Sequence, residues 1–330
     1  ILPIFEDGQL NKAPKLIDAA NGGIISDFRK NGDIKGKVGQ CRILPVQNKP
    51  YKIVVLVGCG KYEEYSESQY KKAMASALKK LTSTNHKSAT SFLAVGHKSN
   101  KKIDYRSARI MAEVWHQISY EYTATNSKKA KRFDLIKLSF GTNGRKRNPE
   151  MKKGLSHGNT IGSAIQKARY LGDLPANVCT PSFLAKEAKK IASKHSTVSL
   201  KVVNEPEMKK LKMGALLSVT AGSVEPSRLI ILSYQGGKSK QKPIVIVGKG
   251  VTFDSGGISI KPGHKMDEMK FDMCGGAAAI GILQAVADIG LPINVISIVP
   301  ACENLPSGNA TKPGDIVTSM SGQTIEVLNT

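Results

Sequence analysis

Two lysines and two aspartates stand close together in a stretch that mixes glycines with strand-forming residues. Residues 244–247 are a short β-branched run of the kind that fills a buried strand. A lysine between two glycines follows this run at once, and an ammonium group at the end of a buried strand is costly to desolvate. The four charged residues fall within 24 positions, at Lys249, Asp254, Lys261 and Asp272.

Their positions predict a shared pocket. Polar residues that follow the strands of an open α/β sheet meet at its carboxyl edge, where such folds bind ligands. Paired carboxylates suit hard divalent cations, and a lysine amine can join them as a ligand once its proton is displaced. Asp254 could then bridge two cations. The alternative is that Lys249 and Asp254 form an internal salt bridge in a turn, and the spacing alone leaves both interpretations open.

Other common sites are not indicated. The glycine-rich stretch lacks the G-x-x-x-x-G-K-[ST] order of a phosphate loop, and no G-x-G-x-x-G opens a helix. None of the six histidines forms an H-E-x-x-H motif, which excludes a thermolysin-like site. The five scattered cysteines form no C-x-x-C pair, so neither a disulfide framework nor a thiolate zinc site is expected. A reducing, cytoplasmic location fits this cysteine usage best.

Composition is that of a globular protein with room for two domains. Of the 330 residues, 40% are hydrophobic and 23% are charged, and we find no apolar run long enough to span a membrane. The net charge of +23 is concentrated in residues 1–160, which hold 30 Lys and Arg against 13 Asp and Glu. The basic clusters lack interleaved aromatic residues, which favours a solvated basic face over nucleic-acid binding. A DNA-binding or regulatory role of this region remains the alternative function.

The chain alternates strand and helix patterns, which predicts an α/β fold. Strands are expected at residues 51–60, 88–96 and 133–141, with helices at 66–81 and 105–122, as in a largely parallel sheet. Residues 141–159 are interpreted as a loop or domain boundary, followed by a helix that ends before Pro175. Beyond it, Thr180 and Pro181 begin another helix. Further strands are expected at residues 229–235, 243–250 and 293–304, with a helix at 274–290.

Two motifs resemble the leucyl aminopeptidase family of di-metal exopeptidases: VGKGVTFDSGGISIKP at 247–262 and MDEMKFDMCGGAAA at 266–279. The similarity extends through LPANVCTP at 174–181 and through residues 208–223 and 299–330. It implies an α/β protein of two domains. Residues 1–150 match in outline a variable, macrodomain-like N-terminal domain. Residues 151–173 are a linker helix, and residues 174–330 are the first part of a catalytic domain with a central mixed sheet.

The resemblance also implies a role for each candidate residue. Lys249 and Asp272 hold one metal ion, and Asp254 bridges two. Lys261 is the catalytic lysine, whose ammonium faces the scissile carbonyl oxygen. Met269 forms the floor of the pocket for the first side chain of the substrate. All five are expected to contact substrate. The expected cofactors are two divalent ions, zinc or manganese first and magnesium or cobalt next, with bicarbonate as a proton shuttle.

The implied activity is that of a cytoplasmic, metal-dependent aminopeptidase that releases leucine and similar residues from peptides. The implied assembly is a homohexamer. In the family, Asn-Thr is followed by Asp-Ala-Glu-Gly-Arg, whose acids complete the metal shell and whose arginine holds the anion. This sequence ends at Asn329-Thr330. We therefore expect the chain to carry part of the site, with an inactive fragment as a further alternative.

Overall fold

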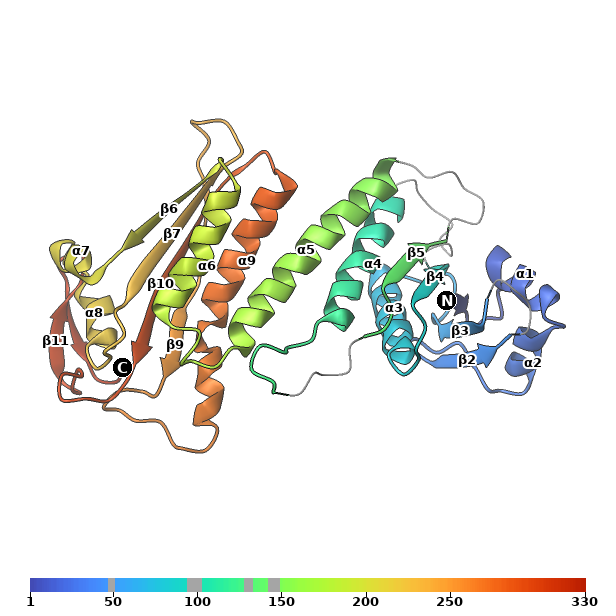
Figure 1. The fold of residues 1–330 in the computed structure, drawn as a ribbon, viewed down its shortest axis with the longest axis horizontal. Helices are drawn as coiled ribbons and strands as arrows, with labels where there is room; N and C mark the ends of the chain where they lie inside the picture. The colour runs from blue at the N-terminus through green and yellow to red at the C-terminus, as the bar shows by residue number, and fades with distance from the viewer. Residues whose placement is uncertain (47–50, 94–102, 128–132, 142–148) are drawn as a thin grey trace. The chain divides into compact units, whose positions relative to one another are not determined.

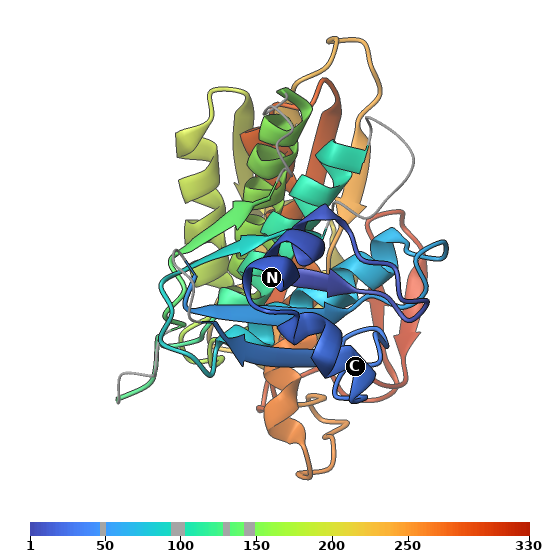
Figure 2. The same cartoon turned by 90° about the vertical axis from the view of Figure 1, so that its right-hand side faces the viewer.

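The chain forms two units, each with its own core. The computed structural model describes residues 1–46, 51–93, 103–127, 133–141 and 149–330, and Figures 1 and 2 show the course of the chain in two views. Unit 1 comprises residues 1–121 and 128–163, and unit 2 comprises residues 122–127 and 164–330. The basic clusters at 128–132 and 145–147 lie outside the described residues.

Unit 1 is a small α/β unit, as the sequence predicts. The strands β1 (Leu2–Ile4), β3 (Ile53–Gly58) and β2 (Cys41–Pro45) lie in the order β1-β3-β2, with β1 parallel and β2 antiparallel to β3. β4 (Ser88–Ser91) pairs in parallel with β5 (Lys137–Phe140). The helices are α1 (Lys12–Ala20), α2 (Ile24–Lys30), α3 (Glu67–Leu81), α4 (Ile103–Ser119) and the first part of α5 (Pro149–Asp173).

The prediction of a loop over residues 141–159 is wrong for the described part. Helix α5 already begins at Pro149. Its glycines serve helix packing, because an added Cβ at Gly154 or Gly158 would lie 2.3 or 2.4 Å from a backbone carbonyl oxygen of α4. A methyl group at either position would force the two helices apart. Spaced four residues apart, these glycines share one helix face.

Unit 2 is built on the predicted mixed sheet, in the strand order β6-β7-β10-β8 with β9 also paired to β10. β7 (Arg228–Gln235) is antiparallel to β6 (Val198–Val203) and to β10 (Asn294–Asn304), whereas β8 (Ile244–Val247) and β9 (Gly250–Asp254) run parallel to β10. The helices are α6 (Pro181–Lys194), α7 (Glu205–Lys210), α8 (Gly214–Thr220), the 3₁₀ helix η2 (Met266–Met273) and α9 (Cys274–Ile289). β11 (Asp315–Thr318) and β12 (Thr324–Val327) form a hairpin.

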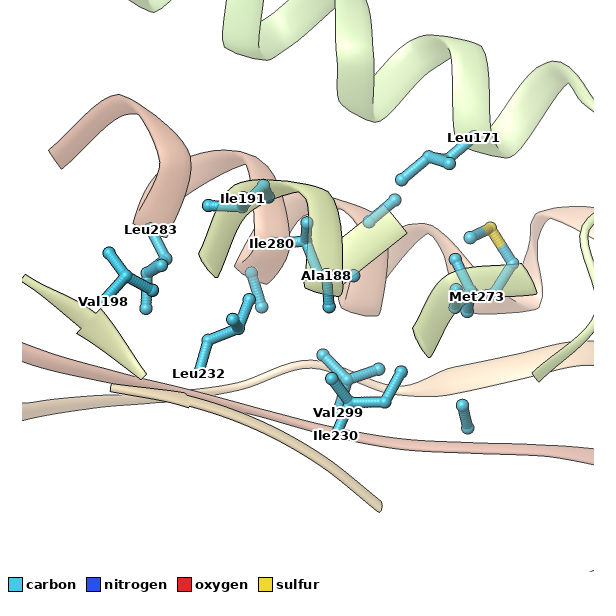
Figure 3. Close-up of a cluster of buried hydrophobic side chains, with 14 of the residues drawn as sticks. Leu171, Ala188, Ile191, Val198, Ile230, Leu232, Met273, Ile280, Leu283 and Val299 are labelled. Carbon is cyan, nitrogen blue, oxygen red and sulfur yellow. The ribbon is translucent and has the colours of Figure 1, made fainter. Parts of the chain in front are cut away.

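The core of unit 2 lies between the sheet and the helices α6 and α9 (Figures 1 and 3). Leu232 of β7, Ile280 of α9 and Leu184 of α6 are fully buried in it. Burial of one such side chain stabilises the fold by about 1.5–3 kcal/mol. The core therefore holds α9 firmly against β10, which matters because α9 begins at the candidate site.

Two properties of this unit bear on the sequence-based expectation. The burial predicted for the β-branched run of β8 is not seen among the described residues, where Ile244, Val245 and Val247 are exposed to 51–68% and β8 stands at the end of the strand order. Residues Met266–Ile289 form one described stretch that is long and apolar enough to cross a membrane. Half of its apolar window is buried inside the fold, as in the core helix of a folded domain.

A buried carboxylate ties α5 to α6. Glu187, 3% exposed, pairs with Lys167 of α5 and lies 2.5 Å from the Lys190 ammonium. Burial alone raises the pKa of Glu187, but hydrogen bonds from Lys167 and Lys190 outweigh it and hold the pKa below 4.5. Since the pKa is lowered on folding, the stabilisation is complete above about pH 4.5 and is lost as the pH falls through the folded-state pKa.

We expect Glu187→Gln to remove this pH dependence. The parent protein should lose protection of its α6 amides as the pH drops below 4.5, whereas the variant should be less protected at pH 7 and change less on acidification. The measurement is the protection factor from hydrogen exchange at pH 7 and pH 3.5. Glu326→Gln, an exposed carboxylate, is the control. Parallel pH profiles of parent and Glu187→Gln would contradict the assignment.

Candidate active site

The site begins where β8 and β9 meet. Both strands pair in parallel with β10, at residues 295–298 and 301–304 respectively. They therefore lie end to end along β10, with a break at residues 248–249 between them. Gly248 donates its N–H to the carbonyl of Ile298 at the break. Lys249 therefore leaves the sheet at the break itself, and Asp254 stands at the carboxyl end of β9.

The start of α9 packs directly on this break. Gly276 donates its N–H to the carbonyl of Lys249 at 2.6 Å. A Cβ on Gly248 would lie 2.2 Å from the carbonyl oxygen of Gly275, a distance at which an atom cannot be accommodated. The helix predicted at residues 274–290 is confirmed as α9, and its close approach brings Asp272, at the end of η2, beside Lys249.

The four predicted charged residues form two ion pairs. The Lys249 ammonium lies 2.7 Å from Oδ2 of Asp272, and the Lys261 ammonium lies 3.2 Å from Oδ2 of Asp254. The alternative salt bridge between Lys249 and Asp254 is not the pairing observed. The Lys249 side chain is 58% exposed in this chain, beside the exposed strand β8, and its desolvation stays a prediction.

A glycine-rich loop returns Lys261 to Asp254. Gly256 and Gly257 have φ angles of 88° and 64°, in the left-handed region that favours glycine. The loop closes where Lys261 donates its N–H to the carbonyl of Ser255 at 2.9 Å. Two residues that are seven positions apart in the sequence are thereby held face to face.

The two carboxylates differ in their electrostatics. Burial raises the pKa of Asp254, but hydrogen bonds from Asn304, from the N–H of Gly256 and from Lys261 outweigh it and lower the pKa below 3.8. For Asp272, burial and the neighbouring Asp254 carboxylate outweigh the effect of Lys249 and raise the pKa above 3.8. Asp254 raises the pKa of Asp272 because the two carboxylates lie close to each other, as a cation held by both requires.

One carboxylate oxygen of Asp272 has a lysine as its partner. Oδ2 of Asp272 is buried and lies 2.7 Å from the Lys249 ammonium. Among the described residues, no group of three or more His, Cys, Asp and Glu side chains is placed to hold a metal ion. The donors assembled here are instead two carboxylates and a lysine amine. This set fits a hard divalent cation, with Oδ2 of Asp272 as one donor.

Two further residues lie near the ion pairs. Met269 lies three residues before Asp272 on η2 and is partly buried; its place in a substrate pocket stays a prediction. Asn304 was not among the predicted site residues, yet it is 4% exposed and donates from its amide nitrogen to Oδ1 of Asp254 at 2.9 Å. A polar residue at the carboxyl end of a long apolar strand was the signal that could have revealed it.

Comparison with known proteins identifies the family. Residues 166–330 match the catalytic domain of the cytosol aminopeptidase family, and residues 1–129 match the N-terminal domain of the same family. The chain belongs to the cytosol aminopeptidase family. The two matched regions account for most of the chain, and the resemblance predicted from the motifs at 247–262 and 266–279 is confirmed.

Curated relatives of the family align over the whole chain. A probable cytosol aminopeptidase of Nitrosococcus oceani is 43% identical over 334 residues, which covers 100% of this chain and 66% of the relative. A probable cytosol aminopeptidase of Methylobacillus flagellatus is 41% identical over 332 residues, with the same shares covered. The chain thus spans 66% of the length of these relatives.

Solved structures of the family have the same fold. A mutant of tomato leucine aminopeptidase is 31% identical and superposes with a TM-score of 0.84, covering 97% of this chain and 61% of that one. The bottromycin maturation enzyme BotP, in complex with Mn, is 28% identical with a TM-score of 0.79, covering 92% of this chain and 62% of that one. The two-domain α/β prediction is confirmed for this member of the cytosol aminopeptidase family.

The close packing at the break is testable by adding one methyl group. We expect Gly248→Ala to destabilise the protein by about 1–3 kcal/mol, because the new Cβ collides with a backbone oxygen that cannot move alone. Gly308→Ala is the control, since a Cβ there meets nothing within 4 Å, and its effect should stay within about 0.5 kcal/mol. Urea unfolding followed by circular dichroism measures both. Equal stability of the two variants would contradict a tight contact.

Proposed function

We propose that the protein is a metal-dependent aminopeptidase that releases the N-terminal residue of peptides. The observation that carries the proposal is the meeting of two carboxylates and two lysines at the carboxyl end of β9, in a member of the cytosol aminopeptidase family. Because the chain spans 66% of the length of its curated relatives, the activity of the whole protein is part of the proposal.

Lys249, Asp254 and Asp272 are proposed as metal ligands. To bind, Lys249 would give up a proton and its contact with Asp272, which would free Oδ2 of this carboxylate for the metal ion. We propose two divalent ions, zinc or manganese before magnesium or cobalt, because oxygen and amine donors accept all four. Bound together, they supply Lewis acidity that activates water and polarises the scissile carbonyl.

The protein side chains supply orientation and charge. We propose that the free α-amine of a peptide, which an acylated amine cannot replace, completes the donor set at the cation held by Asp272, and this would restrict cleavage to the first residue. Lys261, held beside Asp254 and 37% exposed, keeps its ammonium directed at the carbonyl oxygen and stabilises the negative charge that develops there. Met269, on the same 3₁₀ helix as Asp272, is proposed to contact the first side chain.

The finer expectations of the resemblance are proposed with it. We propose peptide substrates with leucine or similar first residues, a homohexamer, bicarbonate as a proton shuttle, and a cytoplasmic location, which the name of the relatives supports. The domain limits of 1–150, 151–173 and 174–330 are proposed on the same basis. The clusters that suggest nucleic-acid binding lie partly outside the described residues, so this alternative stays a prediction.

An assay with matched substrates tests the proposal. The full polypeptide with Mn²⁺ should hydrolyse leucine p-nitroanilide and leave N-acetyl-leucine p-nitroanilide intact, and a chelator should abolish the activity. Lys261→Ala should lower kcat by about 100- to 1,000-fold, as loss of one charge-stabilising donor does, while metal content is retained. Lys265→Ala, an exposed lysine that follows on the same loop, should leave kcat unchanged. Cleavage of the acetylated substrate, or activity that survives chelation, would refute the proposal.

A further inference from the structure

β9 carries a bulge next to the proposed ligand Asp254. Ala301 pairs with Gly250 and Cys302 with Val251, but the register then shifts, and Glu303 pairs with Phe253 and Asn304 with Asp254. Thr252 is the extra residue, and its hydroxyl donates to the carbonyl of Cys302 at 3.3 Å. In a regular ladder Asn304 would lie opposite Phe253. The bulge therefore places Asn304 opposite Asp254, and bulges commonly redirect a side chain at an active site.

Asn304 holds the carboxylate of Asp254 in one orientation. Its amide nitrogen donates to Oδ1 at 2.9 Å, and the N–H of Gly256 donates to the same oxygen at 3.0 Å. An ionised carboxylate only accepts hydrogen bonds, so the nitrogen of the amide must be the atom that faces it. With Oδ1 occupied by two donors, Oδ2 is the oxygen that faces Lys261.

The same residue holds the loop that carries Lys261. The backbone carbonyl of Asn304 accepts from the N–H of Ser255 at 3.0 Å and from its hydroxyl at 2.7 Å. Ser255 in turn accepts the N–H of Lys261. A Cβ on Gly257 would lie 2.7 Å from the side-chain oxygen of Asn304, so the loop closes tightly over the amide. Asn304 thus contacts both the carboxylate of Asp254 and the loop that carries Lys261.

We propose that Asn304 is a positioning residue, whose side-chain amide fixes the oxygen that Asp254 presents to a metal ion. The inference rests on the proposed metal-dependent function. It assigns to the bulge at Thr252 the role of bringing Asn304 into register with Asp254. Residues that orient a metal ligand in this way typically change metal affinity about 10- to 100-fold when they are removed.

Asn304→Ala and a matched variant on the same strand test the proposal. Asn294 lies at the other end of β10, is also buried, and donates from its amide to the carbonyls of Lys238 and Gln241, both at 2.9 Å. Asn294→Ala therefore removes comparable hydrogen bonds away from the site. Binding of Mn²⁺ to the full polypeptide is measured by electron paramagnetic resonance of the free ion. We expect Asn304→Ala to weaken binding by about 10- to 100-fold and Asn294→Ala to leave it unchanged.

Two outcomes would overturn the proposal: unchanged Mn²⁺ affinity in Asn304→Ala, or an equal loss in both variants. Asn304→Ser is the milder substitution if the alanine variant does not fold. Its hydroxyl is too short to reach Asp254, so the same loss of affinity is expected.

A metal-free crystal structure separates this inference from the proposed function. Failure of the parent protein to bind Mn²⁺ would refute the metal site itself. The positioning role is then decided by the orientation of Asp254 in metal-free Asn304→Ala. A carboxylate turned away from Lys261 supports the role, and an unchanged carboxylate refutes it.

Discussion

The arrangement of the site depends on one backbone contact, the approach of the first turn of α9 to the break between β8 and β9. Gly275 and Gly276 meet Gly248 and Lys249 at distances that leave no room for a side chain, and a single hydrogen bond of 2.6 Å joins the two segments. The core of unit 2 holds both partners, since α9 is buried along one face and β10 supports the break. Lys249 and Asp272, 23 positions apart in the sequence, become neighbours for this reason.

The charges that this contact brings together balance one another without a metal. Each aspartate has its own lysine. The pairing of Asp272 is the less favourable one, because burial and the neighbouring Asp254 carboxylate raise the pKa of this carboxyl despite Lys249. Two acids held near each other gain stability from a shared cation. Asn304, through the bulge in β9, fixes which oxygen of Asp254 is available to that cation. The backbone contact thus sets the positions of the charged residues, and their side chains then pair with the nearest opposite charge.

Much of this could be predicted from the sequence, because the signals are local. Thr180 before Pro181 marked the start of α6, and the run at residues 274–290 marked α9. The predictions that failed depend on contacts between residues that are far apart in the sequence. The glycines of α5 looked like a loop because their packing partner is on another helix. Asn304 was missed because its role depends on a register shift between two strands.

The most direct test of the central claim is a crystal of the full polypeptide soaked in Zn²⁺, with the ion located by anomalous scattering. We predict zinc at about 2.0–2.2 Å from the Lys249 amine and from carboxylate oxygens of Asp254 and Asp272, with the contact between Lys249 and Asp272 broken. An absent anomalous peak, with the Lys249 ammonium still against Asp272, would contradict the account.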